Sequence, residues 1–253
     1  MTSLETRGLT IRFGGHVAVD GVSCAFRPGE LTAIVGPNGA GKTTYFNLIS
    51  GQLPATAGAV LLEGNDITRL SAPARTRAGI GRAFQLTNLF PGLSVMENVR
   101  LAIQSQAGVH YDMLRPWMRH TALIERADAV LARVALESRR DVPASVLSHG
   151  DQRKLEVALM IALEPKIFMF DEPTAGMSVD EVPVVLDLIA QLKQDKTKTI
   201  LLVEHKMDVV RSLADRIIVL HNGKLVADGA PAEVIASPVV QEAYLGSFAE
   251  RAA

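Results

Sequence analysis

Hydrophobic and polar residues alternate along the first thirty residues and form unbroken apolar runs farther on. The alternation at residues 9–13 and 22–26 predicts strands of an antiparallel sheet with one solvated face. The short apolar runs at residues 31–35, 167–170, 199–203 and 216–220 are typical of strands buried on both faces. Helix-forming segments follow several of these runs. Strands that alternate with helices predict a largely parallel sheet with the functional groups at the strand ends.

A helical pattern replaces the strand pattern between residues 87 and 150. Apolar residues there recur every three or four positions, as on one helix face: Ile124, Ala127, Val130, Leu131 and Val134. We therefore expect one domain spanning residues 1–253. Its α/β core, with an antiparallel β edge, would comprise residues 1–86 and 151–253. An inserted α-helical subdomain would comprise residues 87–150.

A phosphate-binding motif, G-x-x-x-x-G-K-[ST], occupies residues 36–43, between the predicted strand and a predicted helix at 43–50. Its glycines let backbone N–H groups turn inward toward phosphate oxygens. Lys42 can reach the β- and γ-phosphates, and the Thr43 hydroxyl can ligate Mg²⁺. An ordinary glycine-rich turn would have no use for Lys-Thr-Thr at the start of a helix. We predict that ATP contacts Asn38, Gly39, Ala40, Gly41, Lys42, Thr43 and Thr44.

A pair of carboxylates, Asp171 and Glu172, ends the apolar strand at residues 167–170. Carboxylates beside a hydrophobic core lower the stability of the fold unless they pair with a cation or bind a ligand. Asp171 is placed to hold Mg²⁺ directly or through water, and Glu172 can orient the attacking water. Such a pair alone could equally begin a loop or cap a helix. Together with the phosphate-binding motif it indicates nucleotide hydrolysis and predicts that the α/β core is of the P-loop NTPase type.

The amino-acid composition limits the classes of partner that the chain is expected to bind. The chain has 26 Lys and Arg against 27 Asp and Glu, so no basic excess favours nucleic acid. One cysteine, Cys24, excludes an internal disulfide and is expected to be a small buried residue. The N-terminal residues do not resemble a signal peptide, and no apolar run has transmembrane length. We expect a soluble chain that reaches a membrane only through a partner.

Several further motifs, in this order along the chain, resemble those of ABC-type ATPases. Leu-Ser-His-Gly-Asp-Gln at 147–152 is similar to the family's Leu-Ser-Gly-Gly-Gln signature, before a helix expected at 152–163. Gln85 matches the glutamine loop, and His205 matches the switch histidine. The resemblance implies that Glu172, His205 and Gln85 are catalytic, with Gln85 also near Mg²⁺. It implies that Ser148 and Gly150 cap the γ-phosphate of ATP held by a second ABC ATPase subunit. Phe13 and Val17 would contact the adenine, with the Phe13 ring stacked on it, although Phe13 could instead pack in the core.

Three positions depart from the family pattern: His149, Asp151 and Ser178. Asp151 would be unfavourable near phosphate unless its side chain turns toward a cation. Ser178 replaces the common aspartate of the loop at 175–178, which the family uses for contact between subunits.

Residues 12–19, 81–85, 89–90 and 96–99 resemble ATP-binding subunits of branched-chain amino acid importers. Residues 147–150 resemble the urea and short-amide relatives, which remain an alternative, as do lipopolysaccharide-type exporters and soluble ABC ATPases. The importer resemblance implies transmembrane permease subunits, a periplasmic solute-binding protein and a cytoplasmic location on the inner face of the plasma membrane. Leu86, Leu89 and Phe90 would receive a permease helix or, alternatively, pack inside the helical subdomain.

Overall fold

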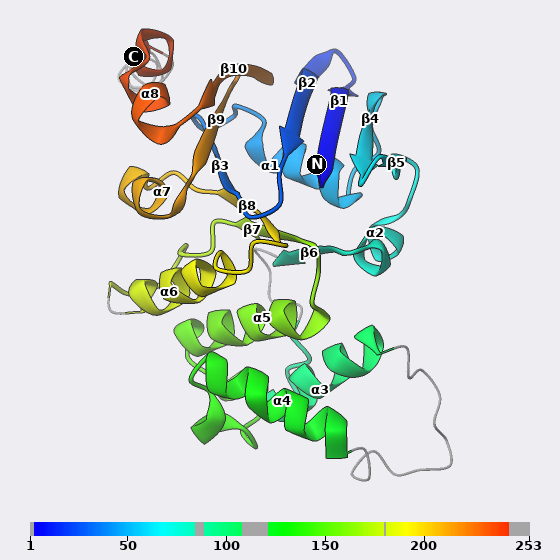
Figure 1. Ribbon diagram of the computed structural model, residues 1–253, viewed down its shortest axis with the longest axis vertical. Helices are drawn as coiled ribbons and strands as arrows, with labels where there is room; N and C mark the ends of the chain where they lie inside the picture. Colours follow the sequence, from blue (N-terminus) through cyan, green and yellow to red (C-terminus); the bar gives the residue numbers. More distant parts are fainter. Residues whose placement is uncertain (1–2, 84–88, 108–120, 180, 243–253) are drawn as a thin grey trace. The chain divides into compact units, whose positions relative to one another are not determined.

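The computed structural model describes residues 3–83, 89–107, 121–179 and 181–242 (Figure 1). The chain divides into two compact units. The first unit comprises Met1–Arg82, Lys166–Glu172 and Leu192–Ala253, and the second comprises Ala83–Pro165 and Pro173–Gln191. The predicted helical subdomain at residues 87–150 corresponds to only part of the second unit, and its boundaries stay a prediction.

The main sheet of the described residues has the strand order β10-β9-β3-β8-β7-β6. Its strands are β3 (Leu31–Val35), β6 (Ile80–Ala83), β7 (Ile167–Asp171), β8 (Thr199–Val203), β9 (Arg216–His221) and β10 (Lys224–Gly229). Strand β3 pairs in parallel with β8 and β9, and β7 pairs in parallel with β8. Every residue of β3, β7 and β8 is buried, which explains their unbroken apolar sequences. The predicted largely parallel sheet is confirmed.

A second, antiparallel sheet carries the alternating N-terminal segments. Its order is β2-β1-β4-β5, with β1 (Leu4–Phe13), β2 (His16–Phe26), β4 (Ala57–Leu62) and β5 (Asn65–Asp66). Strand β1 pairs antiparallel with both β2 and β4. The predicted antiparallel edge is therefore confirmed. One hydrophobic core joins both sheets to helix α1 (Lys42–Ser50).

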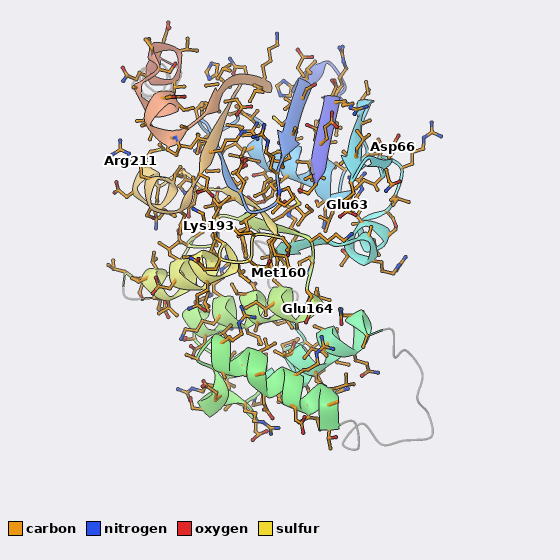
Figure 2. The ribbon with its side chains drawn as sticks, viewed as in Figure 1. Glu63, Asp66, Met160, Glu164, Lys193 and Arg211 are labelled. Atoms are coloured by element: carbon orange, nitrogen blue, oxygen red, sulfur yellow. The ribbon has the colours of Figure 1, made fainter. Side chains whose placement is uncertain are left out.

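The other helices of the first unit are α2 (Ala72–Ala78), α7 (Met207–Leu213) and α8 (Pro231–Ala236). Helix α1 starts one residue before the predicted helix and ends at Gly51, whose φ of 79° only glycine adopts easily. Asn222 and Gly223 form the predicted hairpin turn between β9 and β10, with φ values of 49° and 76°. Lys193, labelled in Figure 2, pairs with Asp215 at 2.7 Å.

The second unit contains α3 (Val95–Gln106), α4 (Thr121–Arg133), α5 (His149–Leu163) and short 3₁₀ turns at Glu137–Arg139 and Ala144–Val146. It also contains α6 (Val182–Leu192) except for the last residue of that helix, which belongs to the first unit. Helices α3, α4 and α5 pack against one another (Figure 1). On α4, Ala127 and Leu131 are buried as predicted, whereas Ile124 and Val130 are only half-buried. Leu123 is buried in their place, so the apolar face is rotated from the predicted one.

Among the residues described, no helix combines the length and the hydropathy that a membrane crossing requires. Cys24 is 5% exposed, as expected for a small core residue, and burial raises the pKa of its thiol to about 11.

We predict that Tyr45→Phe lowers the free energy of unfolding by about 1–2 kcal/mol. The Tyr45 hydroxyl is fully buried and lies 2.8 Å from Thr6 Oγ1, which ties α1 to β1. Urea denaturation of the full chain measures the change. An unchanged midpoint would show that this hydrogen bond adds nothing to the attachment of α1.

Candidate functional site

The phosphate-binding loop connects β3 to α1 and is closely surrounded by backbone. Gly36 and Gly41 have φ values of 150° and 95°. A Cβ atom on Gly36 would collide with the carbonyl oxygen of Leu220, and one on Gly41 with that of Ala18. The Gly223 N–H donates to the Ala40 oxygen at 3.1 Å. Neighbouring backbone therefore leaves no room for a side chain at these two positions of the loop.

Lys42 folds back over this loop. Its Nζ donates to the carbonyl oxygens of Gly36 at 2.7 Å and Pro37 at 2.9 Å, and the side chain is buried. Burial lowers the pKa of Lys42, and the carboxylates of Glu172 and Asp171 oppose that shift. An ammonium group held by two neutral carbonyls can exchange them for charged phosphate oxygens, which bind it more strongly.

The remaining predicted loop residues differ in exposure. Asn38, Gly39 and Thr43 are exposed, Thr44 is half-buried, and Ala40 is buried. The Thr43 side chain, in the first turn of α1, is thus open to a ligand from solvent.

Asp171 ends β7 with its side chain fully buried. Its Oδ2 accepts a hydrogen bond from Arg82 Nη2 at 2.7 Å, whereas its Oδ1 is buried without a hydrogen-bond partner among the described residues. A buried acceptor with no donor suits a cation or a water molecule. The described residues contain no cluster of three or more His, Cys, Asp or Glu that could hold a metal. Mg²⁺ nevertheless fits here, because it commonly takes few protein ligands and completes its shell with phosphate and water.

Glu172 and His205 lie together at the ends of adjacent strands β7 and β8. Glu172 Oε1 is 3.4 Å from His205 Nδ1, and the Glu172 N–H donates to the Val203 oxygen at 2.9 Å. Glu172 has a φ of 51°, a strained value for a residue with a side chain. The structure thus brings the two predicted catalytic residues into contact. The third, Gln85, lies outside the described residues.

Phe13 lies at the turn between β1 and β2 and is 50% exposed, whereas Val17 is half-buried. The exposure of Phe13 contradicts the alternative that it packs in the core. Its adenine contact stays a prediction.

In the second unit, Ser148 caps α5. Its Oγ accepts a hydrogen bond from the Asp151 N–H at 3.1 Å, so α5 starts at His149 and the predicted start at Gln152 was wrong. Asp151 Oδ1 pairs with Lys154 Nζ at 2.9 Å. The carboxylate that departs from the family pattern is therefore turned to a cation.

Glu181 covers Gly150 in the same unit. A side chain at Gly150 would collide with the Glu181 carboxylate, and Glu181 Oε2 accepts a hydrogen bond from the Ser178 N–H at 3.1 Å. The Glu181 carboxylate therefore lies against the signature at Gly150 and binds the loop at 175–178 through the Ser178 N–H.

Two contributors were missed from the sequence, Arg82 and Glu181. Arg82 is a charged residue in the otherwise apolar segment 79–84, which was a usable signal. Glu181 follows Ser178 by three residues, the spacing of a capping box at a helix start.

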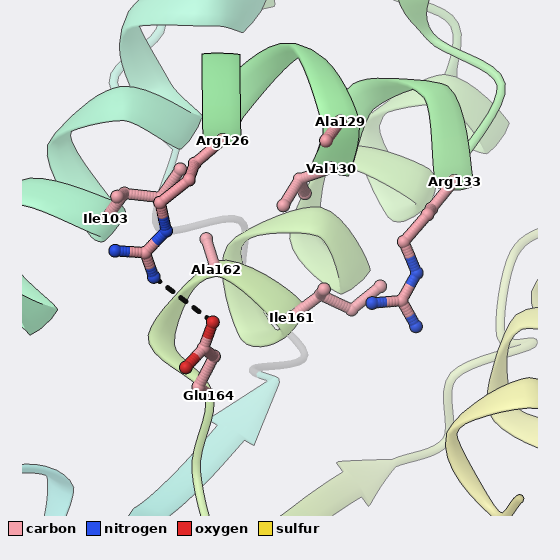
Figure 3. Close-up of a pocket in the computed structure, with 8 residues that line it drawn as sticks. All are labelled: Ile103, Arg126, Ala129, Val130, Arg133, Ile161, Ala162 and Glu164. Carbon is pink, nitrogen blue, oxygen red and sulfur yellow. Dashed lines mark hydrogen bonds and ion pairs between the residues drawn. The ribbon is translucent and has the colours of Figure 1, made fainter. Parts of the chain in front are cut away.

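Helices α3, α4 and α5 also line a pocket of about 210 Å³ (Figure 3). Arg126 and Glu164 form an ion pair of 3.1 Å at this pocket. It contains none of the residues predicted to bind nucleotide.

Comparison with known proteins extends these observations. The profile of the ABC transporter family matches residues 19–175. A profile described as branched-chain amino acid ATP-binding cassette transporter matches residues 224–250.

Similar proteins cover almost the whole chain. The high-affinity branched-chain amino acid transport ATP-binding protein LivG of Escherichia coli K12 is 38% identical over 96% of this chain and 97% of its own. BraF of Pseudomonas aeruginosa, with the same description, is 37% identical over 96% and 97%. The crystal structure of the ADP conformation of MJ1267, an ATP-binding cassette of an ABC transporter, aligns with a TM-score of 0.83. It is 30% identical and covers 97% of this chain and 99% of its own.

We predict that Gly41→Ala destabilises the protein more than Gly39→Ala and weakens ATP binding more. Both glycines have positive φ, so each substitution costs about 1–2 kcal/mol of backbone strain. At Gly41 the new Cβ atom would also collide with backbone, whereas none of the described residues has an atom within 4 Å of the Cβ position of Gly39. Urea denaturation and ATP titration of both variants test this. Equal effects would mean that the packing around Gly41 does not shape the loop.

Proposed function

The chain is an ATPase of the ABC transporter family, and we propose that it energises the import of branched-chain amino acids. The observation that carries the proposal is similarity along the whole chain, at 37–38% identity, to ATP-binding proteins of such transport systems. The profile match at residues 224–250 supports the same substrate class. The signature Leu-Ser-His-Gly, which resembles urea-type relatives, makes urea or a short amide the second candidate solute.

ATP would bind along the loop between β3 and α1. Phe13 and Val17 would contact the adenine, because Phe13 offers an exposed ring at the β1–β2 turn. The N–H groups of residues 38–44 and the start of α1 would hold the phosphates. Lys42 would move from its carbonyl partners to the β- and γ-phosphates.

Mg²⁺ would be held by the Thr43 hydroxyl and Asp171 Oδ1, with Gln85 as a further contact. The ion would neutralise phosphate charge during hydrolysis. Asp171 supports this role because its Oδ1 has no other partner in the described residues.

Glu172 would accept the proton of the water that attacks the γ-phosphate. His205 would contact the γ-phosphate and hold Glu172 in place. Their 3.4 Å contact supports a shared task, since it joins the base to the phosphate sensor without an intermediate residue.

A second ABC ATPase subunit, identical or related, would complete each site. Its Ser148 and Gly150 would cap the γ-phosphate, because they begin a long helix whose N-terminus favours anions. ATP would then close the pair and hydrolysis would open it.

Permease subunits would contact the segment around Phe90, whose side chain is 57% exposed. The Phe90 N–H donates to Asn98 Oδ1 at 2.8 Å, and Asn98 Nδ2 donates to the Phe90 oxygen at 3.1 Å. An apolar ring on a rigid backbone suits docking to another protein. This exposure argues against packing of Phe90 inside the helical unit. The complex would include a periplasmic solute-binding protein, with this subunit on the cytoplasmic face of the plasma membrane.

We predict that Glu172→Gln keeps MgATP binding and lowers turnover by at least about a hundredfold, as expected for loss of a general base. Binding and phosphate-release assays on the purified chain separate the two effects. Scattering in the presence of ATP should detect a pair of subunits that stays closed. Hydrolysis at the parent rate would rule out Glu172 as the base.

Phe90→Asp should abolish transport and leave the ATPase activity of the isolated subunit unchanged. The substitution places a charge on the exposed ring position without touching the nucleotide loop. Uptake in cells and ATP hydrolysis by the purified variant measure the two outcomes. Loss of folding, seen by circular dichroism, would instead mean that Phe90 packs within its own chain.

The solute itself is tested by uptake of labelled leucine and urea in cells that lack this subunit. Restoration of leucine uptake by the parent chain, with co-purification of permease subunits, is expected. Restored uptake of urea alone would select the second candidate. Co-purification with an exporter or with ribosomes would overturn the importer proposal.

A further inference from the structure

The guanidinium group of Arg82 connects three elements of the first unit. Arg82 lies on β6, and its Nη2 donates to Asp171 Oδ2 at the end of β7. Its Nη1 donates to Asn47 Oδ1 at 2.6 Å and to Ser50 Oγ at 2.8 Å, both on α1. Its Cζ lies 5.6 Å from the ring centre of Phe46, also on α1. The Arg82 side chain is 8% exposed, so these contacts are shielded from water.

This arrangement fixes the spacing between two predicted magnesium contacts. Thr43 is in the first turn of α1, and Asp171 is the last residue of β7. Arg82 binds both α1 and Asp171 through one rigid planar group. A movement of α1 relative to the end of β7 would therefore break a charge-assisted hydrogen bond.

The same contact leaves the two oxygens of Asp171 unequal. Oδ2 is held by the guanidinium, while Oδ1 is buried without a partner in the described residues. Rotation of the carboxylate out of this orientation would break the ion pair, so the pair with Arg82 holds one oxygen of Asp171 toward the guanidinium and the other away from it. Oδ1 is thus the oxygen that the pair with Arg82 leaves for a further ligand.

We propose that Arg82 is a positioning residue for the Mg²⁺–ATP complex, which it serves by holding Asp171 so that Oδ1 faces the ion. The inference rests on the proposed role of Asp171 as a magnesium contact. A lysine at this position keeps the charge but cannot bind Asp171 and α1 in the same planar fork.

The test compares affinity for a fluorescent ATP analogue in Mg²⁺ and in EDTA, using the full chain. Arg82→Lys should lower the ratio of the two affinities by about tenfold or more, as typical for residues that orient a metal ligand. The affinity in EDTA should stay unchanged, because the phosphate loop and Lys42 are intact. A merely structural role would weaken both affinities alike.

Arg75→Lys is the matched control. Arg75 is also a buried arginine bound to α1, through the oxygens of Leu48 and Ile49 at 2.6 Å, and its hydrogen bonds within the described part of the chain do not involve Asp171. Its replacement should lower the melting temperature and leave the ratio unchanged. An unchanged ratio in Arg82→Lys, or an equal fall in both variants, would overturn the proposal.

A second variant guards against misfolding of Arg82→Lys. Asn47→Ala combined with Ser50→Ala removes the hydrogen bonds from the guanidinium to α1, leaves its contact with Phe46 and keeps its pair with Asp171. A fall of the ratio in the same direction supports the proposal, and no fall overturns it. Failure of the proposed function is distinguishable, since the parent chain would then show no Mg²⁺-dependent nucleotide binding.

Discussion

Parallel pairing of β8 with β3 on one side and β7 on the other is the constraint on which the proposed ATP site depends. Parallel neighbours end at the same edge of a sheet, so the loop after β3, the carboxylates at the end of β7 and the histidine after β8 meet there. Complete burial of the three strands holds this edge in place. Predicted binding and catalytic residues between positions 36 and 205 are thereby brought together by backbone hydrogen bonds of the sheet, which involve none of their side chains.

Most of this arrangement could be predicted because it follows from local patterns in the amino-acid sequence. Unbroken apolar runs identified the buried strands, and glycine and lysine spacing identified the loop. Helix limits were less certain. The start of α5 lies three residues before the predicted Gln152, because the Ser148 cap already places His149 in the first turn of the helix. The face of α4 was rotated because Leu123 and Ile124 are both apolar, and only packing against α3 and α5 decides between them.

The candidate site was predictable in its residues and less so in their partners. Asp171 and Glu172 stand out at the end of an apolar strand. The contact between Arg82 and Asp171 joins residues 89 positions apart, and no local pattern encodes such a pairing. Likewise, Gly150 fits the signature by type, but its cover by Glu181 depends on how α5 and the start of α6 pack within one unit. Pairings of this kind follow from the tertiary structure.

The hairpin between β9 and β10 has a consequence for how the protein can change. Gly223 receives a hydrogen bond from the Asp20 N–H and gives one to the Ala40 oxygen, so main-chain atoms brace the phosphate loop from the far end of the sequence. Contacts of this type are indifferent to most side-chain replacements. They are sensitive to the length of the hairpin, because one inserted residue would move Gly223 away from its hydrogen-bond partners Asp20 and Ala40. The hairpin therefore tolerates side-chain substitutions better than insertions or deletions.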